Sequence, residues 1–236
     1  MQIIPIKTRV LTPPKDDLLA VIDEYLTNVR EGDIIAISSK VVAIHEGRCV
    51  PQAEANKEDL VTTEADFIIP RPYWNTPLTV TKHAFLGASG IDESNGDGYL
   101  VLLPEDSFAA AKRFCEHLKA KFGLTNLGVI VTDSHSTPFR YGATGVALGW
   151  YGFRPIEDHR GRSDLFGREI QYERSNLVDG LAAAATVVAG EVDECVPLVV
   201  LRDVPRVVYQ EGDTKDDLFV PYAEDTFRVL YEKWRE

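Results

Sequence analysis

The sequence has only three cysteines in 236 residues, and they lie far apart. Cys49, Cys115 and Cys195 are odd in number and show no CxxC spacing, so the sequence indicates neither a disulfide framework nor a thiolate zinc site. A reducing compartment suits such a chain, and we expect a cytoplasmic protein.

Long apolar runs are also missing. No segment reaches the roughly 18 apolar residues of a membrane-spanning helix. The apolar start MQIIPI is too short for the hydrophobic core of a secretory signal. We therefore expect neither export nor membrane insertion.

Positive charge is scarce, with 25 Lys and Arg against 37 Asp and Glu, which gives a formal net charge of −12. Nucleic acids are bound by cationic side chains that displace counterions from phosphates, so we expect no nucleic-acid partner. A small polyanion such as a nucleotide can still bind where divalent cations or a few arginines reverse the local field.

Several familiar motifs are absent. There is no GxxxxGK[ST] and no GxGxxG that opens a helix, which excludes the usual P-loop and Rossmann motifs. GASGI differs from the GxSxG of a hydrolase elbow at Ser89, and Gly96 takes a ligand position that a calcium loop would need. A triad of Asp133, Ser134 and His135 is disfavoured, because neighbours in an extended segment point to opposite faces.

Strand and helix patterns alternate along the chain, which predicts an α/β fold with mixed sheets and packed helices. No internal repeat is visible, and we expect one domain over residues 1–236, or two intimately packed halves. The expected strands are 1–6, 32–39, 78–87, 99–104, 127–132 and 196–204. The expected helices are 16–30, 58–69, 106–122, 175–190 and a short one within 223–236, with 210–217 as a loop.

Three acidic residues, Asp92, Asp133 and Glu191, each lie where a strand or helix ends and a glycine-containing loop begins. Loops at strand ends build the sites of α/β proteins, and hard divalent cations prefer carboxylate and hydroxyl oxygens. Asp133 with the adjacent Ser134 hydroxyl suits such a cation. A structural alternative stays open for each acid: an Asx-turn at Asp92, a cap at Asp133 and a solvated helix end at Glu191.

Six segments spread from one end of the chain to the other are informative: GDIIAISSKVVAIHEGR, GIDESN, GVIVTDSHSTPFRYGATGVALG, GRSDLFGRE, LAAAATVVAGE and VPLVVLRDV. Together they resemble a known family, the coenzyme F-420-0:L-glutamate ligases, or gamma-glutamyl ligases. The first segment resembles that family's strand and turn ending in E-G-R. Several short matches in the same order are more specific than any one of them.

The resemblance implies a GTP-dependent ligase with the fold of that family. A substrate carboxylate is phosphorylated, and the amino group of L-glutamate attacks the acyl phosphate. It also implies a homodimer and two divalent cations, manganese or magnesium, and leaves room for a monovalent cation. The expected acceptor is coenzyme F-420-0 or a folate-like carboxylate.

Carried over position by position, the resemblance places metal ligands at Asp92, Asp133, Ser134 and Glu191. It places GTP at Arg9, Val10, Leu11, Thr12, Ser39, Lys40, Asn95, Ala189, Gly190, Val192 and Asp193. Asp133 and Arg140 are the predicted catalytic residues. Arg140, Arg160, Arg162 and Arg168 are expected to hold anionic substrate groups, although such arginines also form surface ion pairs.

The chain departs from the family at two places. Ile44 and His45 stand where the family commonly offers a lysine, and Thr137 replaces an arginine. Two other functions therefore stay open: a catalytically silent nucleotide-binding or cofactor-binding module, and a metal-dependent hydrolase.

Overall fold

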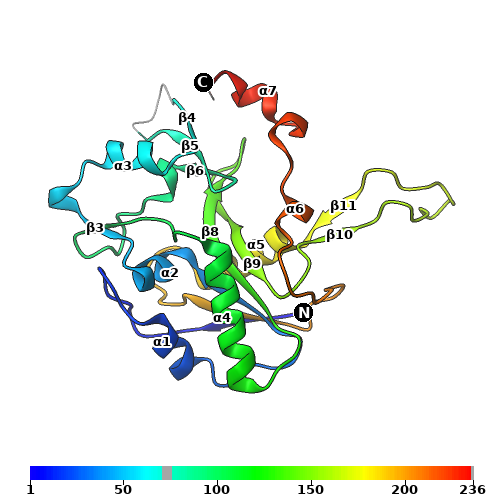
Figure 1. The fold of residues 1–236 in the computed structure, drawn as a ribbon, viewed down its shortest axis with the longest axis horizontal. Coiled ribbons are helices and arrows are strands. Elements are labelled where there is room, and N and C mark those ends of the chain that lie inside the picture. The colour runs from blue at the N-terminus through cyan, green and yellow to red at the C-terminus, as the bar shows by residue number, and fades with distance from the viewer. Residues whose placement is uncertain (71–75, 235–236) are drawn as a thin grey trace.

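A five-stranded sheet runs through the middle of the computed structural model, which describes residues 1–70 and 76–234 (Figure 1). The strand order is β1-β12-β2-β8-β9. Only the central pair β2 and β8 is parallel, and the other neighbours are antiparallel. These strands are β1 (Gln2–Ile6), β2 (Ile34–Ser38), β8 (Gly128–Ser136), β9 (Ala143–Tyr151) and β12 (Leu198–Arg202).

Both faces of this sheet are covered, which explains the continuous apolar runs of its central strands. Along β2, Ile35 and Ile37 belong to the core beneath one group of helices, while Ile34 and Ala36 belong to the core on the other face. The first face carries α1 (Leu18–Tyr25), α2 (Ser39–Glu46) and α4 (Ser107–Phe122), and the second carries α5 (Leu177–Ala189).

The long helices begin and end at residues that suit their ends. The Asp106 carboxylate accepts hydrogen bonds from the backbone N–H groups of Phe108 and Ala109, and Gly123 ends α4 in a left-handed conformation. At α5 the Asn176 side chain accepts from the N–H of Asp179. Both capping patterns are readable in the sequence, and α4 is confirmed as predicted.

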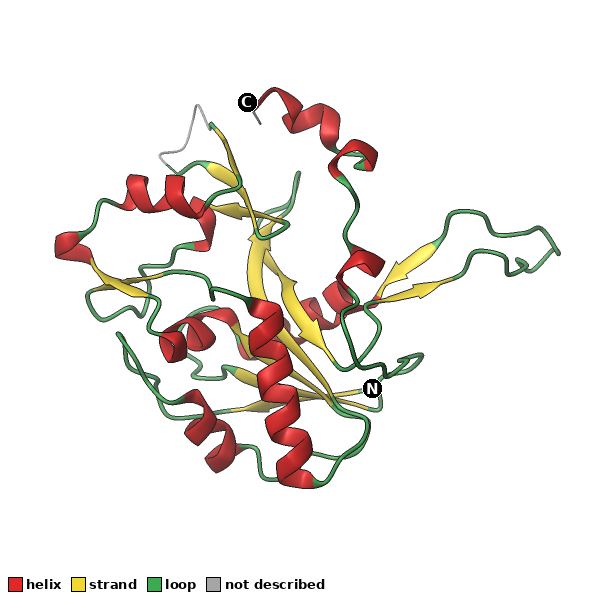
Figure 2. Cartoon of the chain, viewed as in Figure 1, coloured by secondary structure: helices red, strands yellow, loops and turns green. Residues whose placement is uncertain are grey.

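Within residues 1–70 and 76–234, three smaller sheets accompany the central one. They pair β3 (Cys49–Pro51) with β7 (Tyr99–Val101), join β4 (Phe67–Ile69), β5 (Leu78–Thr81) and β6 (Ala84–Gly87), and pair β10 (Ile156–Asp158) with β11 (Arg174–Asn176). The β10–β11 ribbon and the loop beyond it form an arm that projects from the rest of the chain (Figure 2). The remaining helices are α3 (Lys57–Glu64), α6 (Lys215–Leu218) and α7 (Arg228–Tyr231), with short 3-10 turns at 52–54, 88–90, 222–224 and 232–234.

The structure confirms the α/β class with mixed sheets, but several predicted boundaries were wrong. Residues 67–69, predicted as helix, form strand β4 because their backbone pairs with β5. The segment 78–87 is a hairpin of two strands, with Lys82 and His83 at positive φ in its turn. The glycine-rich passage that gave no clear prediction contains the nine-residue strand β9.

Other differences are smaller. The expected strand and turn after Ser38 is helix α2, and α1 is shorter than the predicted 16–30. Residues 215–218 of the predicted loop form α6. Of the predicted terminal helix, residues 228–231 are α-helical, and residues 235–236 lie outside the described part. None of the helices within 1–70 and 76–234 is long and apolar enough to cross a membrane.

Candidate functional site

A pocket of about 420 Å³ lies at the edge of the sheet where the parallel strands β2 and β8 both end. Its walls come from the segment after β1, the start of α2, the end of β8, the loop around Asp92, and the loop that follows α5. Neighbouring parallel strands end on the same side of a sheet, which is the usual place for a site in such folds.

A β-bulge bends the β8–β9 pair just before the pocket. The pairs Val131–Gly149 and Thr132–Ala147 leave Leu148 of β9 as an extra residue between them. A bulge of this kind increases the local twist and redirects side chains. It lies immediately before Asp133 and Ser134, which β8 carries to the pocket.

The pocket brings together all four predicted metal ligands: Asp92, Asp133, Ser134 and Glu191. The acids come from three segments that are distant in the sequence. Asp92 Oδ1 accepts a hydrogen bond from the Ser94 N–H at 2.7 Å, the Asx-turn that the structural alternative predicted. Asp92 therefore shapes its loop and also lines the pocket, so the two interpretations are compatible.

The acids of the pocket influence one another electrostatically. Burial raises the pKa of Asp133 to about 7, although hydrogen bonds from the Ser134 backbone and the Ser39 side chain oppose the rise. The charges of Asp92 and Glu191 raise the pKa further. A cation at this place would relieve both the burial cost and the mutual repulsion.

Lys40, at the start of α2, supplies one such positive charge. Its Nζ lies 2.5 Å from Asp92 Oδ2 and donates to the Ser94 carbonyl oxygen at 3.0 Å. Burial opposes ionisation of Asp92, but Lys40 and the Ser94 donors outweigh it and keep the pKa of Asp92 below its ordinary value. Lys40 thus compensates the carboxylate nearest to it.

The chemistry of the donors fits a hard divalent cation, since carboxylate and hydroxyl oxygens are its preferred ligands. Within the described ranges, however, no group of three or more His, Cys, Asp or Glu side chains is close enough to hold an ion. The metal-binding role of these residues therefore stays a prediction.

Most of the predicted nucleotide residues also line the pocket. They are Arg9, Val10, Leu11, Lys40, Asn95, Ala189, Gly190, Val192 and Asp193. Thr12 and Ser39 are not among the lining residues: the Thr12 N–H donates to Asp16, and Ser39 is buried beside Asp133. Asn95 Nδ2 donates to the Val192 carbonyl oxygen at 2.7 Å and so joins two walls.

The predicted arginines lie elsewhere. Arg140 is exposed near the tip of the β8–β9 hairpin, where its Nη1 donates to the neighbouring Phe139 carbonyl oxygen. On the arm, Arg160 and Arg162 pair with Asp158 and Glu157. Arg168 is also exposed, in the loop beyond β10. The ion pairs of Arg160 and Arg162 agree with the surface-pair alternative, and the substrate-binding role of the three arginines stays a prediction.

The departures from the family pattern have separate places. Ile44 is buried in the pocket wall, while His45 points toward the start of α1. Thr137 follows the end of β8 and is not among the lining residues.

Among the described lining residues, four with a side-chain hydroxyl were not predicted: Thr8, Ser38, Thr132 and Thr186. Ser38 and Thr132 end the apolar runs of β2 and β8, so the strand-end rule that selected Asp133 could have found them. Thr8 and Thr186 carry no such signal.

Comparison with known proteins gives a consistent result. The family model described as F420-0:Gamma-glutamyl ligase matches residues 58–203. A protein of Halorubrum lacusprofundi named coenzyme F420:L-glutamate ligase is 35% identical, with 93% of this chain and 92% of the relative covered. Relatives of the same name from Methanocaldococcus jannaschii and Methanothermobacter thermautotrophicus are 34% and 32% identical. These two matches cover 85% and 89% of this chain, and 86% and 90% of the relatives.

Proposed function

The chain belongs to the F420-0:gamma-glutamyl ligase family, and from that premise we propose that it is a GTP-consuming ligase that joins L-glutamate to a coenzyme F420-type acceptor. Members of this family with that name form an amide bond with glutamate. The nucleotide, the divalent cations and the acyl phosphate are parts of the proposal.

One observation carries it: a single pocket gathers acids from three distant segments together with most of the predicted nucleotide residues. The described lining residues include five acids and two bases, which gives them a formal net charge of −3. The acids are Asp92, Asp133, Glu191, Asp193 and Glu194, and the bases are Arg9 and Lys40. A nucleotide polyanion enters such a pocket only with cations, which is the arrangement that phosphoryl transfer uses.

Asp92, Asp133, Ser134 and Glu191 would hold the divalent cations, which neutralise phosphate charge when bound. Lys40 would add a fixed positive charge at the same end of the pocket. The hydrogen bond from Asn95 to the Val192 carbonyl oxygen joins the loop around Asp92 to the loop that follows α5.

The reaction needs no covalent nucleophile from the protein. An oxygen of the acceptor carboxylate attacks the γ-phosphorus of GTP, and the bond to GDP breaks. The glutamate nitrogen then attacks the acyl carbon, phosphate leaves, and the nitrogen loses a proton. Holding the three reactants in line contributes on the order of 7–11 kcal/mol in favourable cases. We therefore assign the pocket mainly to positioning and charge neutralisation.

The test incubates the protein with GTP, Mn²⁺, L-glutamate and coenzyme F-420-0, and measures phosphate release and the mass of the acceptor. We expect phosphate only when acceptor and glutamate are both present, and an acceptor heavier by one glutamyl unit. Product formed without glutamate would indicate a hydrolase. Nucleotide binding with no turnover on coenzyme F-420-0 or folate-like acceptors would indicate a silent module.

The variant Asp133→Asn keeps the shape of the side chain and removes its charge. We expect its activity to fall at least about 100-fold, because a preorganised charge at a reacting phosphate contributes on that scale. The far-UV circular dichroism should not change. Arg168→Gln, on the arm, serves as a variant of an arginine that lies outside the pocket. Wild-type activity in Asp133→Asn would refute the site assignment.

A further inference from the structure

The segment between β1 and α1 forms one wall of the pocket and is hydrogen-bonded to the loop after α5, which forms another. Arg9, Val10 and Leu11 line the pocket, and Leu11 is also buried in the main core. The Thr8 N–H donates to the Cys195 carbonyl oxygen at 2.9 Å, which joins this segment to the loop after α5.

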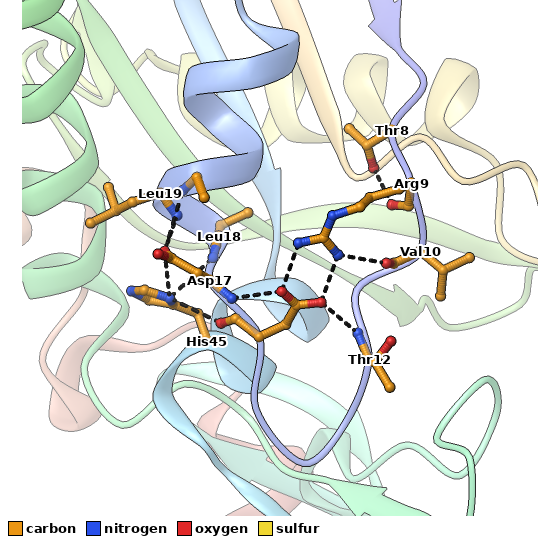
Figure 3. Close-up of polar contacts among 10 residues, drawn as sticks. Thr8, Arg9, Val10, Thr12, Asp17, Leu18, Leu19 and His45 are labelled. Carbon is orange, nitrogen blue, oxygen red and sulfur yellow. Dashed lines mark hydrogen bonds and ion pairs between the residues drawn. The ribbon is translucent and has the colours of Figure 1, made fainter.

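Figure 3 shows the polar contacts of this segment, with Arg9 and Thr12 on either side of one carboxylate. The hydrogen bonds identify this carboxylate as that of Asp16, which is not itself a lining residue. Its two oxygens accept from Nη1 and Nη2 of Arg9, each at 2.7 Å. They also accept from the backbone N–H groups of Thr12 at 2.9 Å and Asp17 at 2.7 Å. One side chain therefore holds Arg9 and Thr12, the residues on either side of the lining residues Val10 and Leu11.

Arg9 is committed to the same arrangement. Its Nη1 donates to the Val10 carbonyl oxygen at 2.9 Å as well as to Asp16. The hydrogen bond from Arg9 lowers the pKa of Asp16, so the carboxylate is charged at neutral pH. A bidentate, charge-assisted pair is among the stronger hydrogen-bonded contacts that a partly exposed loop can form.

His45 connects the segment between β1 and α1 to helix α2. Its Nδ1 lies 3.2 Å from the Leu18 backbone nitrogen and 3.3 Å from the Asp16 carbonyl oxygen. Because α2 also carries Lys40 and Ile44, the two walls that meet at this corner of the pocket are held together.

The end of the pocket where the β1–α1 segment meets α2 suits a nucleoside better than phosphates. Ile44 lies one helical turn beyond Lys40, about 6 Å along α2 at 1.5 Å per residue. Leu11 and Ile44 line the pocket and belong to one apolar core, whereas Asp92 pairs with Lys40 at the other end. The apolar end of the pocket matches the nucleoside, and the acidic end, which needs cations, matches the phosphates.

We propose that Asp16 is a positioning residue that preorganises the nucleoside end of the pocket through Arg9 and the Arg9–Thr12 backbone. The proposal rests on the proposed function, because it takes the ligand of the pocket to be a nucleotide. If the segment is already held in its binding conformation, the ligand does not have to order it, and the affinity is higher by that entropic cost.

The experiment measures nucleotide affinity by calorimetry in Mn²⁺ for the wild type and Asp16→Asn. The dissociation constants of GTP and GDP should both rise about tenfold, which corresponds to ordering one or two side chains and their backbone. Their ratio should stay the same, since Asp16 acts at the nucleoside end. In turnover, the KM for GTP should rise similarly while kcat at saturating GTP stays within about twofold.

Two further variants separate positioning from loop stability. Asp17→Ala removes the neighbouring acid, which caps α1 by accepting from the N–H groups of Leu19 and Ala20, and should lower Tm without changing the dissociation constants. Arg9→Gln should weaken GTP and GDP like Asp16→Asn, and the double variant should be no weaker than either single one.

Unchanged affinities in Asp16→Asn would overturn the proposal, as would an equal loss in Asp17→Ala. A loss for GTP alone would also overturn it, because that result would place Asp16 at the phosphates. A wild-type protein that binds neither nucleotide would refute the proposed function itself, and this outcome is seen before any variant is made.

Discussion

At the scale of single residues, the place of a residue in the fold predicted the pocket better than its charge did. Asp92, Asp133 and Glu191 were selected because each follows a strand or helix, and the fold brings all three to one pocket. Arg140 was predicted to hold an anionic substrate group, and it lies near the exposed tip of a hairpin. Position at the end of a buried strand is set by the fold, whereas the direction of a long side chain on a loop is not.

Burial decides the strength of two ion pairs that have nearly the same length. Arg202 Nη2 lies 2.7 Å from Asp33 Oδ2 inside the protein, and Lys119 Nζ lies 2.8 Å from Glu211, which is 71% exposed. Asp33→Asn leaves a buried guanidinium without its charge partner, which costs about 3–5 kcal/mol. Urea unfolding followed by tryptophan fluorescence measures the loss.

The matched control is Glu211→Gln. An exposed pair contributes about 0–1 kcal/mol, so this variant should unfold at nearly the wild-type urea concentration. Equal losses in the two variants would show that distance matters and burial does not.

The three cysteines should react with iodoacetamide in a fixed order. Burial raises the pKa of Cys115 to about 12, so at pH 8 its thiolate fraction is about 10⁻⁴. Burial also raises the pKa of Cys49. Cys195 is partly exposed and lines the pocket, so it should react first, and GTP with Mn²⁺ should slow it. Peptide mass spectrometry over time measures the three rates, and rapid labelling of Cys115 would contradict the packing around α4.

At the scale of elements, the sequence predicted what local signals specify. The α4 helix has an acidic cap, an apolar face and a terminal glycine, and it was found as expected. Residues 39–46 lacked a side-chain cap and are rich in β-branched residues, which favour strands. There, packing of Val41 and Val42 in the core, and Gly47 in a left-handed conformation, specify a helix.

The packing of α5 on β9 depends on a glycine. A Cβ on Gly145 would overlap Thr186 Oγ1 and the Ala182 carbonyl group, so the helix lies directly on the strand. Gly145→Ala should destabilise the protein by about 1–3 kcal/mol, the usual cost of overpacking. Thermal unfolding by circular dichroism measures the effect. The affinity of the pocket should fall as well, since α5 leads directly into the loop 190–197.

Gly180→Ala provides the control in the same helix. A Cβ at Gly180 meets nothing within 4 Å, and its only local effect is a better helix propensity. This variant should be stabilised by about 0.5–1 kcal/mol. Destabilisation by both substitutions would mean that α5 tolerates no change at all, and the argument from close approach would fail.

At the scale of the whole molecule, the fold and the site depend on different forces. Two apolar cores cover both faces of the central sheet without any contribution from the pocket acids. The pocket instead concentrates part of the net charge of −12 in one place. The implied homodimer stays a prediction, and the arm, with Leu165, Phe166 and Tyr172 exposed, offers an apolar surface that such an assembly could cover.

This separation predicts how ligands change thermal stability. A chelator should leave a cooperative unfolding transition, because the cores form without ions. In saturating Mn²⁺, GTP at about 100 times its dissociation constant should add about 2.7 kcal/mol, since it binds only the folded state. For a chain of this length that corresponds to a rise in Tm of about 5–10 °C.

The rise in Tm with both ligands should exceed the sum of the rises with each ligand alone, because cations relieve the repulsion that Asp92, Asp133 and Glu191 present to phosphates. Differential scanning calorimetry measures Tm in four conditions: with chelator, with Mn²⁺ alone, with GTP alone and with both. In the variant Asp133→Asn, the rise with both ligands should no longer exceed the sum of the separate rises. Separate rises that simply add would show that cations and nucleotide bind independently, and the pocket would then not be a shared site.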